Sequence, residues 1–418
     1  MSSSLNLGSM AQMAQQSSAV LSVVDRNTRS HVIRAIADSI SRQQDAILEA
    51  NTLDLEVSRE MAVPDLLIDW LKLTPERLQS TCQLLVRLSD APDPLFTTDR
   101  VAESMVNCDA YGIRKALGTI ALVYEGFPEL AAIAAGFCIR TGNVLLLRGG
   151  SEASSSNQIM AQVIQTVLDE ANLPQGCLQL VPSNQGDTLR DLLALDSYID
   201  LVIPYGRKSL VQQVVKQSAV PVLKTAMGNC YLFWSLTGSV EQVQHIIVDS
   251  HRSEPDPVNA IDHVLIHRGC NSGAIASLFG DLKAKGFKLK GETDLSDKIP
   301  GIDSIKDSEW QHAFFDKSIA FKFIDSLDDA VTWINRNSSG HADVIVTESY
   351  SESREFVTHI SSTSAYINTS PRFYRYHPVT GGVAFGMSNQ SSQRQGVINF
   401  NTLTSTQLVV QGNSPTVT

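Results

Sequence analysis

Residues 118–124 read GTIALVY, residues 143–148 read NVLLLR and residues 199–204 read IDLVIP, with longer amphipathic stretches between these apolar runs. The runs have the length of strands, and the stretches that separate them have the length of helices. This alternation is typical of a parallel sheet with helices on both faces. We therefore predict an α/β fold in which a doubly wound, nucleotide-binding type of sheet forms the first domain.

Further strands and helices are predicted on both sides of this segment. Residues 220–224, VPVLK, are predicted to add a strand, and a second block of alternating strands and helices runs from about 239 to 366. The segment LTPERL predicts a helix with Thr74 as N-cap and Pro75 at its first position. A final strand is predicted at 407–410, before a frayed tail.

The composition is that of a globular protein with two or three domains. The net charge of −11 over 418 residues gives no electrostatic footprint for nucleic acid or an anionic membrane. The N-terminal segment MSSSLNLGSMAQMAQQ lacks the features of a secretory signal, and the most apolar run, 130–139, has about half the length of a membrane span. We expect a cytoplasmic protein without nucleic-acid or membrane partners.

No metal site is predicted. The six cysteines are scattered without a CxxC pair, which argues against a zinc site and against a disulfide framework. His263 and His267 are four residues apart in an apolar run that reads as a strand, so both lie on one face of a sheet. A core or edge-strand histidine is the expected interpretation.

Several segments together resemble the γ-glutamyl phosphate reductase branch of the aldehyde dehydrogenase superfamily, in its order and nearly its spacing, from about residue 10 to about residue 412. They are ANTLD (50–54), LTPERL (73–78), RTGNVLLLRGG (140–150), YIDLVIPYG (198–206), VPVL (220–223), HADVIVT (341–347) and SAYINTSPRF (364–373). The resemblance implies an aldehyde dehydrogenase-like fold.

That fold comprises a doubly wound nucleotide-binding domain, an α/β catalytic domain and a β oligomerisation arm. The expected segments are 1–238, with part of the arm near 100–115, then 239–368, and then a return segment, 369–418, with a disordered tail. The arm implies a homodimer or a higher homo-oligomer.

The resemblance also implies a reaction, the NADPH-dependent reduction of L-glutamyl 5-phosphate to glutamate 5-semialdehyde in proline biosynthesis. This chemistry needs a thiol that displaces phosphate and forms a thioester. The family's cysteine lies in the loop that reads SEPDPVNAIDHVLIH here (253–267), where Pro255 and Asn259 keep the frame. Val258 occupies the place of the nucleophile, and a valine side chain has no lone pair with which to attack.

The presumed substrate segment departs from the family as well. The family's Tyr-Glu-Ala-Arg-Pro-Asn is represented by Tyr124, followed by Glu125, Gly126, Phe127, Pro128 and Glu129. An arginine that could hold an anion through its fork has become phenylalanine, and a carboxylate replaces an amide. Arg372 and Phe373 match a Thr-Arg-Phe segment near the catalytic loop. Tyr231 replaces the histidine of a GVCH segment.

The cofactor side is better kept, and the resemblance implies NADP(H) as the cofactor. The predicted binding positions are Arg148, Gly149, Gly150, Ser151, Pro204 and Gly206. Glycine suits a close approach of the backbone to a ligand. Ser151 replaces the family's lysine, however, which weighs against binding. Arg207 and Lys208 follow Gly206 in place of small residues, and they could either crowd the cofactor or supply charge to its phosphates.

Three hypotheses follow. The chain is a catalytically silent relative, a pseudoenzyme that serves as a binding or regulatory subunit, for example beside an active paralogue. Alternatively it is an active oxidoreductase that reduces a small-molecule substrate by a route without cysteine. The third hypothesis is a different reaction in the inherited pocket, with Asp256, Glu125 or Glu129 as acid or base. The fold alone does not decide among them, because function belongs to the site.

Overall fold

The chain divides into two compact units in a computed structural model. The model describes residues 6–100, 108–183, 188–252, 256–292, 295, 299, 301–390 and 396–412. Unit 1 comprises Met1–Leu223, Arg375–Phe385 and Ile398–Thr418, and unit 2 comprises Lys224–Tyr374 and Gly386–Val397. The first boundary lies before the predicted position 238, because the strand Cys230–Trp234 pairs with strands of unit 2.

Unit 1 contains the predicted parallel sheet. Its strands are β3 (Thr119–Tyr124), β4 (Val144–Gly149), β5 (Leu178–Leu180) and β6 (Leu201–Tyr205), in the order β5-β4-β3-β6. The helices that follow these strands are α6 (Leu130–Arg140), α7 (Ser154–Glu170), α8 (Thr188–Leu193) and α9 (Lys208–Gln217). The strand predicted at 220–224 is wrong: Val222 makes only an isolated bridge with Val202. Pro221 has no N–H to donate to a ladder.

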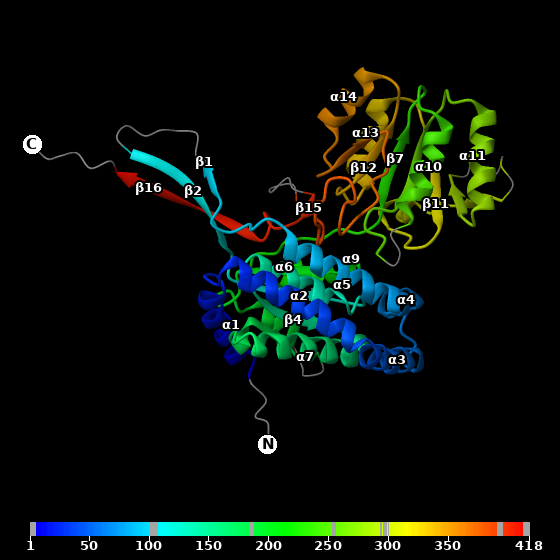
Figure 1. Ribbon diagram of the computed structural model, residues 1–418. Helices are drawn as coiled ribbons and strands as arrows, with labels where there is room; N and C mark the ends of the chain where they lie inside the picture. Colours follow the sequence, from blue (N-terminus) through cyan, green and yellow to red (C-terminus); the bar gives the residue numbers. More distant parts are fainter. Residues whose placement is uncertain are drawn as a thin grey trace, which may run out of the picture. The chain divides into compact units, whose positions relative to one another are not determined.

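Five helices precede the sheet in the chain. They are α1 (Leu7–Leu21), α2 (Arg26–Arg42), α3 (Gln44–Glu60), α4 (Asp65–Leu71) and α5 (Pro75–Asp90). The predicted start of α5 is confirmed: Thr74 is the N-cap, its side chain accepts the N–H of Arg77, and Pro75 is the first helical residue. Helix α2 packs against α5, α6 and α7 (Figure 1).

A three-stranded antiparallel ribbon projects from the body of unit 1 (Figure 1). It consists of β1 (Thr98–Arg100), β2 (Cys108–Ala116) and β16 (Thr404–Gly412), in the order β1-β2-β16. Strand β16 pairs with β2 along its whole length, from Thr404 opposite Ala116 to Gly412 opposite Cys108, so it is longer than the predicted 407–410. The ribbon occupies the predicted arm region, of which 101–107 lie outside the described residues.

Unit 2 contains a second parallel sheet. Its strands are β7 (Cys230–Trp234), β8 (Ile261–His267), β9 (Lys288–Gly291), β10 (Asp303–Ser304), β11 (Ser318–Ile324), β12 (Asp343–Val346) and β13 (Ala365–Ile367), in the order β10-β9-β11-β8-β7-β12-β13. Its main helices are α10 (Val240–Ser250), α11 (Ser272–Ala284), α13 (Leu327–Asn337) and α14 (Tyr350–His359). The short strands β14 (Gly386–Met387) and β15 (Val397–Ile398) pair with each other.

Strand β7 shows why helices cover both faces of this sheet. Its residues alternate between two apolar clusters: Leu232 and Trp234 belong to the cluster that includes α10 and α11, whereas Tyr231 and Phe233 belong to the cluster that includes α13 and α14. All of them are buried. Such a strand reads as a continuous apolar run because it faces a core on each side. The predicted α/β architecture is confirmed.

Within the described part of the chain, no helix is both long and apolar enough for a bilayer. The same residues include no group of three or more His, Cys, Asp or Glu side chains arranged to hold a metal ion.

Candidate functional site

In unit 2 the predicted nucleophile position lies in a loop at the amino end of a central strand. Residues 256–260, here called the 256–260 loop, run into β8, while Gly228 and Asn229 run into β7 and His341 precedes β12. Strands β8, β7 and β12 are neighbours in the sheet. Because parallel strands begin at the same edge, these three segments meet there. Pro255, which was expected to keep the loop's frame, lies outside the described residues.

The loop is fastened through the backbone carbonyl of Val258. This oxygen accepts a hydrogen bond from the N–H of Gly228 at 2.9 Å and one from Nε2 of His341 at 2.6 Å. The amide of Asn259 donates to the carbonyl of Pro371 at 2.5 Å. Val258 itself is 1 % exposed. The frame of the loop is therefore firmly held, but the side chain at its centre is hydrocarbon.

The His341 side chain that holds this carbonyl is neutral. Burial lowers the pKa of His341 to about 4. A carbonyl only accepts hydrogen bonds, so Nε2 must carry the proton, and Nδ1, which lies 2.8 Å from the hydroxyl of Ser339, is the unprotonated nitrogen. Sequence reasoning missed His341, although a histidine directly before an apolar strand run was an available signal.

The cysteine nearest to this loop is no substitute nucleophile. Sγ of Cys230 lies 3.4 Å from Nε2 of His341, a separation that suits a thiol and a base. That nitrogen, however, already donates its proton to Val258. Burial, together with Asp343 and Asp262, raises the pKa of Cys230 well above its usual value. Burial also raises the pKa of Cys270, whose thiol donates to the carbonyl of Ser235 at 3.6 Å.

Two buried carboxyl groups hold the start of β7 between its neighbours. Asp262 of β8 accepts the N–H of Asn229 at 2.6 Å, and Asp343 of β12 accepts the N–H of Tyr231 at 2.8 Å. Burial raises the pKa of Asp262 to about 7 and that of Asp343 to about 6. Both contacts go to backbone N–H groups, which gives these carboxyls a structural role. Their signal in the sequence was a charged residue inside an apolar run.

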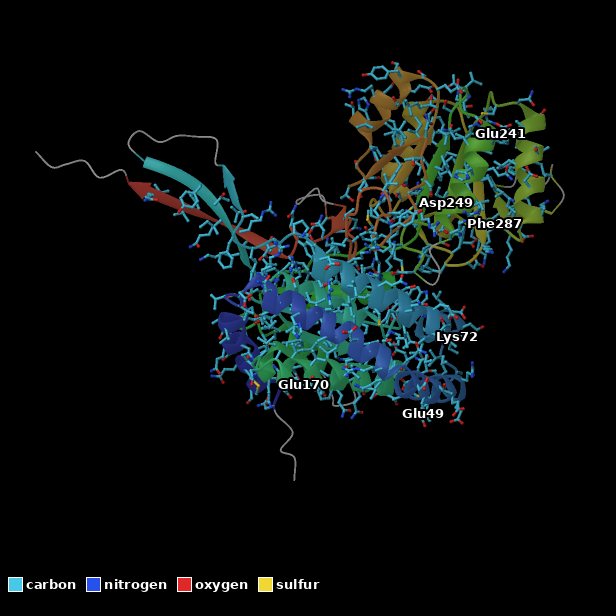
Figure 2. All side chains as sticks on the ribbon, viewed as in Figure 1. Glu49, Lys72, Glu170, Glu241, Asp249 and Phe287 are labelled. Atoms are coloured by element: carbon cyan, nitrogen blue, oxygen red, sulfur yellow. The ribbon has the colours of Figure 1, made fainter. Side chains whose placement is uncertain are left out.

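Other predicted positions in unit 2 are also engaged within the unit. Tyr231 donates its hydroxyl to the carbonyl of Trp310 at 2.6 Å and packs on the ring of His263 at 4.6 Å. Burial lowers the pKa of His263 to about 3, so this histidine is a neutral core residue. Arg372 bonds Asp249, 3.3 Å between Nη1 and Oδ1. Asp249 lies near the end of α10 and is labelled in Figure 2. Phe373, which follows it, is buried.

In unit 1 the predicted positions gather at the carboxyl ends of β3, β4 and β6, here called the carboxyl edge of unit 1. Glu125, directly after β3, accepts three hydrogen bonds from Arg207, the second residue after β6. They come from the backbone N–H at 2.5 Å, from Nε at 3.0 Å and from Nη2 at 2.8 Å. The Glu125 carboxylate raises the pKa of Arg207. From the sequence, Arg207 could either crowd a cofactor or supply charge to its phosphates. In the structure the charge of Arg207 is matched by Glu125.

Phe127 belongs to the core of unit 1. Its backbone has a left-handed φ of 42°, and Gly126 before it has a φ of 61°. Its ring stacks on Trp70 of α4 at 4.8 Å and meets Tyr205 edge-on at 5.9 Å. The N–H of Phe127 donates to the carbonyl of Trp70 at 3.1 Å. The side chain that replaces the family's arginine is therefore enclosed by aromatic residues of its own unit.

Glu129 forms an ion pair with Arg77 of α5. Both side chains are largely buried, and the guanidinium also donates to the carbonyl of Trp70 at 3.2 Å. The carboxylate that replaces the family's amide is thus paired with a positive charge of unit 1.

The predicted cofactor glycines are overlain by side chains of the same unit. A Cβ at Gly206 would lie 2.5 Å from the side chain of Glu125, and one at Gly150 would lie 2.1 Å from the carboxylate of Glu152. A Cβ at Gly149 would lie 2.0 Å from the amide of Asn157. Gly206 also has a φ of 150°, which favours glycine, and at all three positions the nearest atoms belong to side chains of unit 1.

The remaining predicted cofactor positions contribute little to a phosphate site. Nη1 of Arg148 donates to the carbonyl of Gly149 at 2.7 Å, and Pro204 lies within β6 opposite Val123. Ser151 is exposed and carries no charge. With two carboxylates over the glycines, the described residues of this edge do not fit the anionic pyrophosphate of NADP(H).

Comparison with known proteins extends these observations to the whole chain. No protein-family model matches it. It is 45 % identical over 390 residues to γ-glutamyl phosphate reductase 2 of Synechocystis sp., an alignment that covers 93 % of each chain. The crystal structure of γ-glutamyl phosphate reductase from Thermotoga maritima matches with a TM-score of 0.87 at 27 % identity, over 96 % of this chain and 97 % of that one. A probable aldehyde dehydrogenase from Listeria monocytogenes shares the fold, with a TM-score of 0.72 at 13 % identity over 97 % and 96 % of the two chains.

Proposed function

The chain belongs to the γ-glutamyl phosphate reductase family of the aldehyde dehydrogenase superfamily, and we propose that it is a member without the family's thiol-dependent activity. In this proposal it serves as a binding or regulatory subunit that keeps the inherited fold. The observation that carries the proposal is Val258, a buried hydrocarbon side chain at the centre of a loop whose frame is held by hydrogen bonds.

The chemistry of the family reaction makes this substitution decisive. A thioester can form only on sulfur, and the thiolate is the attacking form. Cys230, the cysteine that approaches the 256–260 loop, is fully buried and has a raised pKa. The loop around Val258 is fixed in place, because the carbonyl of Val258 is bonded by both Gly228 and His341.

The arm supports assembly with a second chain of the same kind. Strand β16 is an edge strand, and its side chains are exposed over most of its length, including Leu408 and Val410. A ribbon of so few strands has little stability alone, and an open edge is a template for pairing with another strand. A homodimer in which the arm pairs with the partner accounts for both features.

The test uses the purified full-length chain and measures nicotinamide absorbance. The reverse direction is convenient, with glutamate 5-semialdehyde, phosphate and NADP⁺ as reactants, and an active family member serves as the positive control. We expect turnover indistinguishable from a reaction without protein. Turnover proportional to the concentration of the wild-type chain contradicts the proposal.

A further inference from the structure

The order of the strands in unit 1 locates the place where a ligand of this fold would sit. From β3 the chain moves outward to β4 and β5, and then returns across the sheet to place β6 on the other side of β3. In open parallel sheets the ligand crevice lies outside the carboxyl ends of the strands, at the point where the strand order reverses. In unit 1 that point lies between β3 and β6.

An ion pair bridges this point. Tyr124 and Tyr205, the last residues of β3 and β6, are register partners, and Glu125 and Arg207 follow them. The N–H of Glu125 donates to the carbonyl of Tyr205 at 3.2 Å, and the carboxylate of Glu125 receives three donors of Arg207. Glu125 is 9 % exposed. The two strand ends are thus joined by backbone and side chain together.

The neighbouring donors that could bind an anion are also engaged. The first three N–H groups of α6, on residues 130–132, donate to the carbonyls of residues 127–129 at 2.9–3.3 Å. At the start of α7, the N–H groups of Ser155 and Ser156 donate to Asp54 at 2.9 and 2.7 Å. The N–H of Gly126 donates to Glu152 at 3.0 Å. Helix N-termini bind phosphate through such groups, and here carboxylates and carbonyls of the chain already occupy them.

Helix α9 has Arg207 as its N-cap residue, and the Arg207 side chain makes no cap hydrogen bond to the helix. Its guanidinium turns to Glu125 instead. An incoming pyrophosphate would have to take Arg207 away from Glu125. The pyrophosphate would then lie beside the buried carboxylate of Glu125, from which the positive partner had been removed. This is unfavourable for the pyrophosphate and for the carboxylate.

We propose that Glu125 and Arg207 determine the ligand specificity of unit 1, by closing the switch-point crevice to the pyrophosphate of a nicotinamide dinucleotide. The residue that departs from the family here is Arg207, which follows Gly206 in place of a small residue. Glu125 matches the family's glutamate and holds this arginine at the ends of β3 and β6. The wild-type chain therefore does not take up NADPH or NADH at the concentrations that serve a dehydrogenase. This inference stands independently of the missing thiol, which lies in unit 2.

The test is a calorimetric titration of the full-length chain with NADPH, and separately with NADH. Glu125→Gln keeps the size of the side chain and removes the charge that holds Arg207. We expect no saturable binding to the wild-type chain and binding at least about tenfold tighter for Glu125→Gln, with a gain that shrinks as salt is added. Glu309→Gln makes the same change at the ion pair with Lys290 in unit 2 and is expected to leave binding as in the wild type.

A second variant covers the case in which Glu125→Gln fails to fold. Arg207→Lys retains the positive charge but cannot form the fork to a carboxylate, so part of the gain is expected. The inference is overturned if the wild-type chain binds NADPH as tightly as the variants, or if neither folded variant gains affinity. Wild-type binding without turnover overturns this inference and leaves the proposed function standing, whereas wild-type turnover overturns both.

Discussion

At the amino ends of the strands of unit 2, the chain keeps the frame of a loop and changes the side chain at its centre. At the carboxyl ends of the strands of unit 1, it keeps the glycines and fills the space beside them. In unit 2 the carbonyl of Val258 is held by Gly228 and His341, and the change that we propose there is the loss of the reactive atom. In unit 1 Glu125 and Arg207 form an ion pair at the ends of β3 and β6. In unit 2 the change concerns one side chain, Val258, whereas in unit 1 a cofactor would have to displace the hydrogen bonds between Glu125 and Arg207.

The largest expected effect concerns the core beneath the carboxyl edge of unit 1. Phe127→Ala removes a ring that is enclosed by Trp70 and Tyr205, and should lower the free energy of unfolding by about 3–5 kcal/mol. Chemical denaturation followed by tryptophan fluorescence measures the change. Phe96→Ala is the matched control, because Phe96 also has a left-handed φ, of 59°, but is exposed; its effect should stay within about 0.5 kcal/mol. Equal losses in the two variants would show that Phe127 is not a core residue.

The second prediction concerns the frame of the 256–260 loop. His341→Ala leaves a cavity and removes a donor from the carbonyl of Val258, so the free energy of unfolding should fall by about 2–4 kcal/mol. Denaturant titration of the variant and of His245→Ala, an exposed position on α10, makes the comparison. If His341→Ala is as stable as His245→Ala, the histidine does not hold the loop, and the contrast between the two edges loses its basis.

The fold could be predicted from the sequence where strands alternate with helices, as they do from β3 to β6. Strand β7 was not predicted, although CYLFW is a continuous apolar run like those of β3 and β4. It does not follow the alternation of strands with helices, because the described residues 218–229 before it form no helix. Strand β9 was not predicted either, because two of its four residues are lysines, which are not typical of a buried strand. It lies toward the outside of the sheet, next to β10. Both strands are defined by the neighbours that they pair with, and those neighbours are distant in the sequence.

The candidate site was predictable in position but not in its contacts. The frame of the loop pointed to Val258, yet the histidine that fastens it lies 83 residues away. Two roles were considered for Arg207, crowding the cofactor and supplying charge to its phosphates, and both were chemically reasonable. The choice between them depended on Glu125, which is 82 residues distant in the chain. Long-range hydrogen bonds of this kind follow from the register of β3 with β6, and a single sequence does not specify that register.

A third prediction uses the pH dependence of unit 2. The pKa of Asp262 in the folded chain is about 7, above its ordinary value of 3.8, so the folded state binds the proton more tightly than the unfolded state does. The stability that this group contributes is complete below pH 3.8 and is lost as the pH rises through 7. Asp262→Asn should therefore remove a decline of roughly 2 kcal/mol between pH 5 and pH 7.

This decline is measured as the difference between wild type and variant, because His341 and His263 act in the opposite direction. Their lowered pKa values destabilise the folded state as the pH falls below about 6.5. Asp281→Asn, at an exposed position on α11, should leave the pH profile of the wild type unchanged. Parallel profiles for wild type and Asp262→Asn would mean that Asp262 ionises normally in the folded chain.

The smallest expected effect on stability belongs to Val258→Cys, and it tests the comparison most directly. The two side chains are close in volume, so the free energy of unfolding should change by less than about 1.5 kcal/mol. The new thiol would stand in the loop frame that Gly228 and His341 hold. If only unit 2 had lost its chemistry, this variant would turn over glutamate 5-semialdehyde with NADP⁺. Because the carboxyl edge of unit 1 is also closed, we expect no turnover from Val258→Cys alone and measurable turnover only when Glu125→Gln is added. Activity in the single variant would show that the ion pair of Glu125 and Arg207 yields to the cofactor, and that the two edges differ less than their geometry indicates.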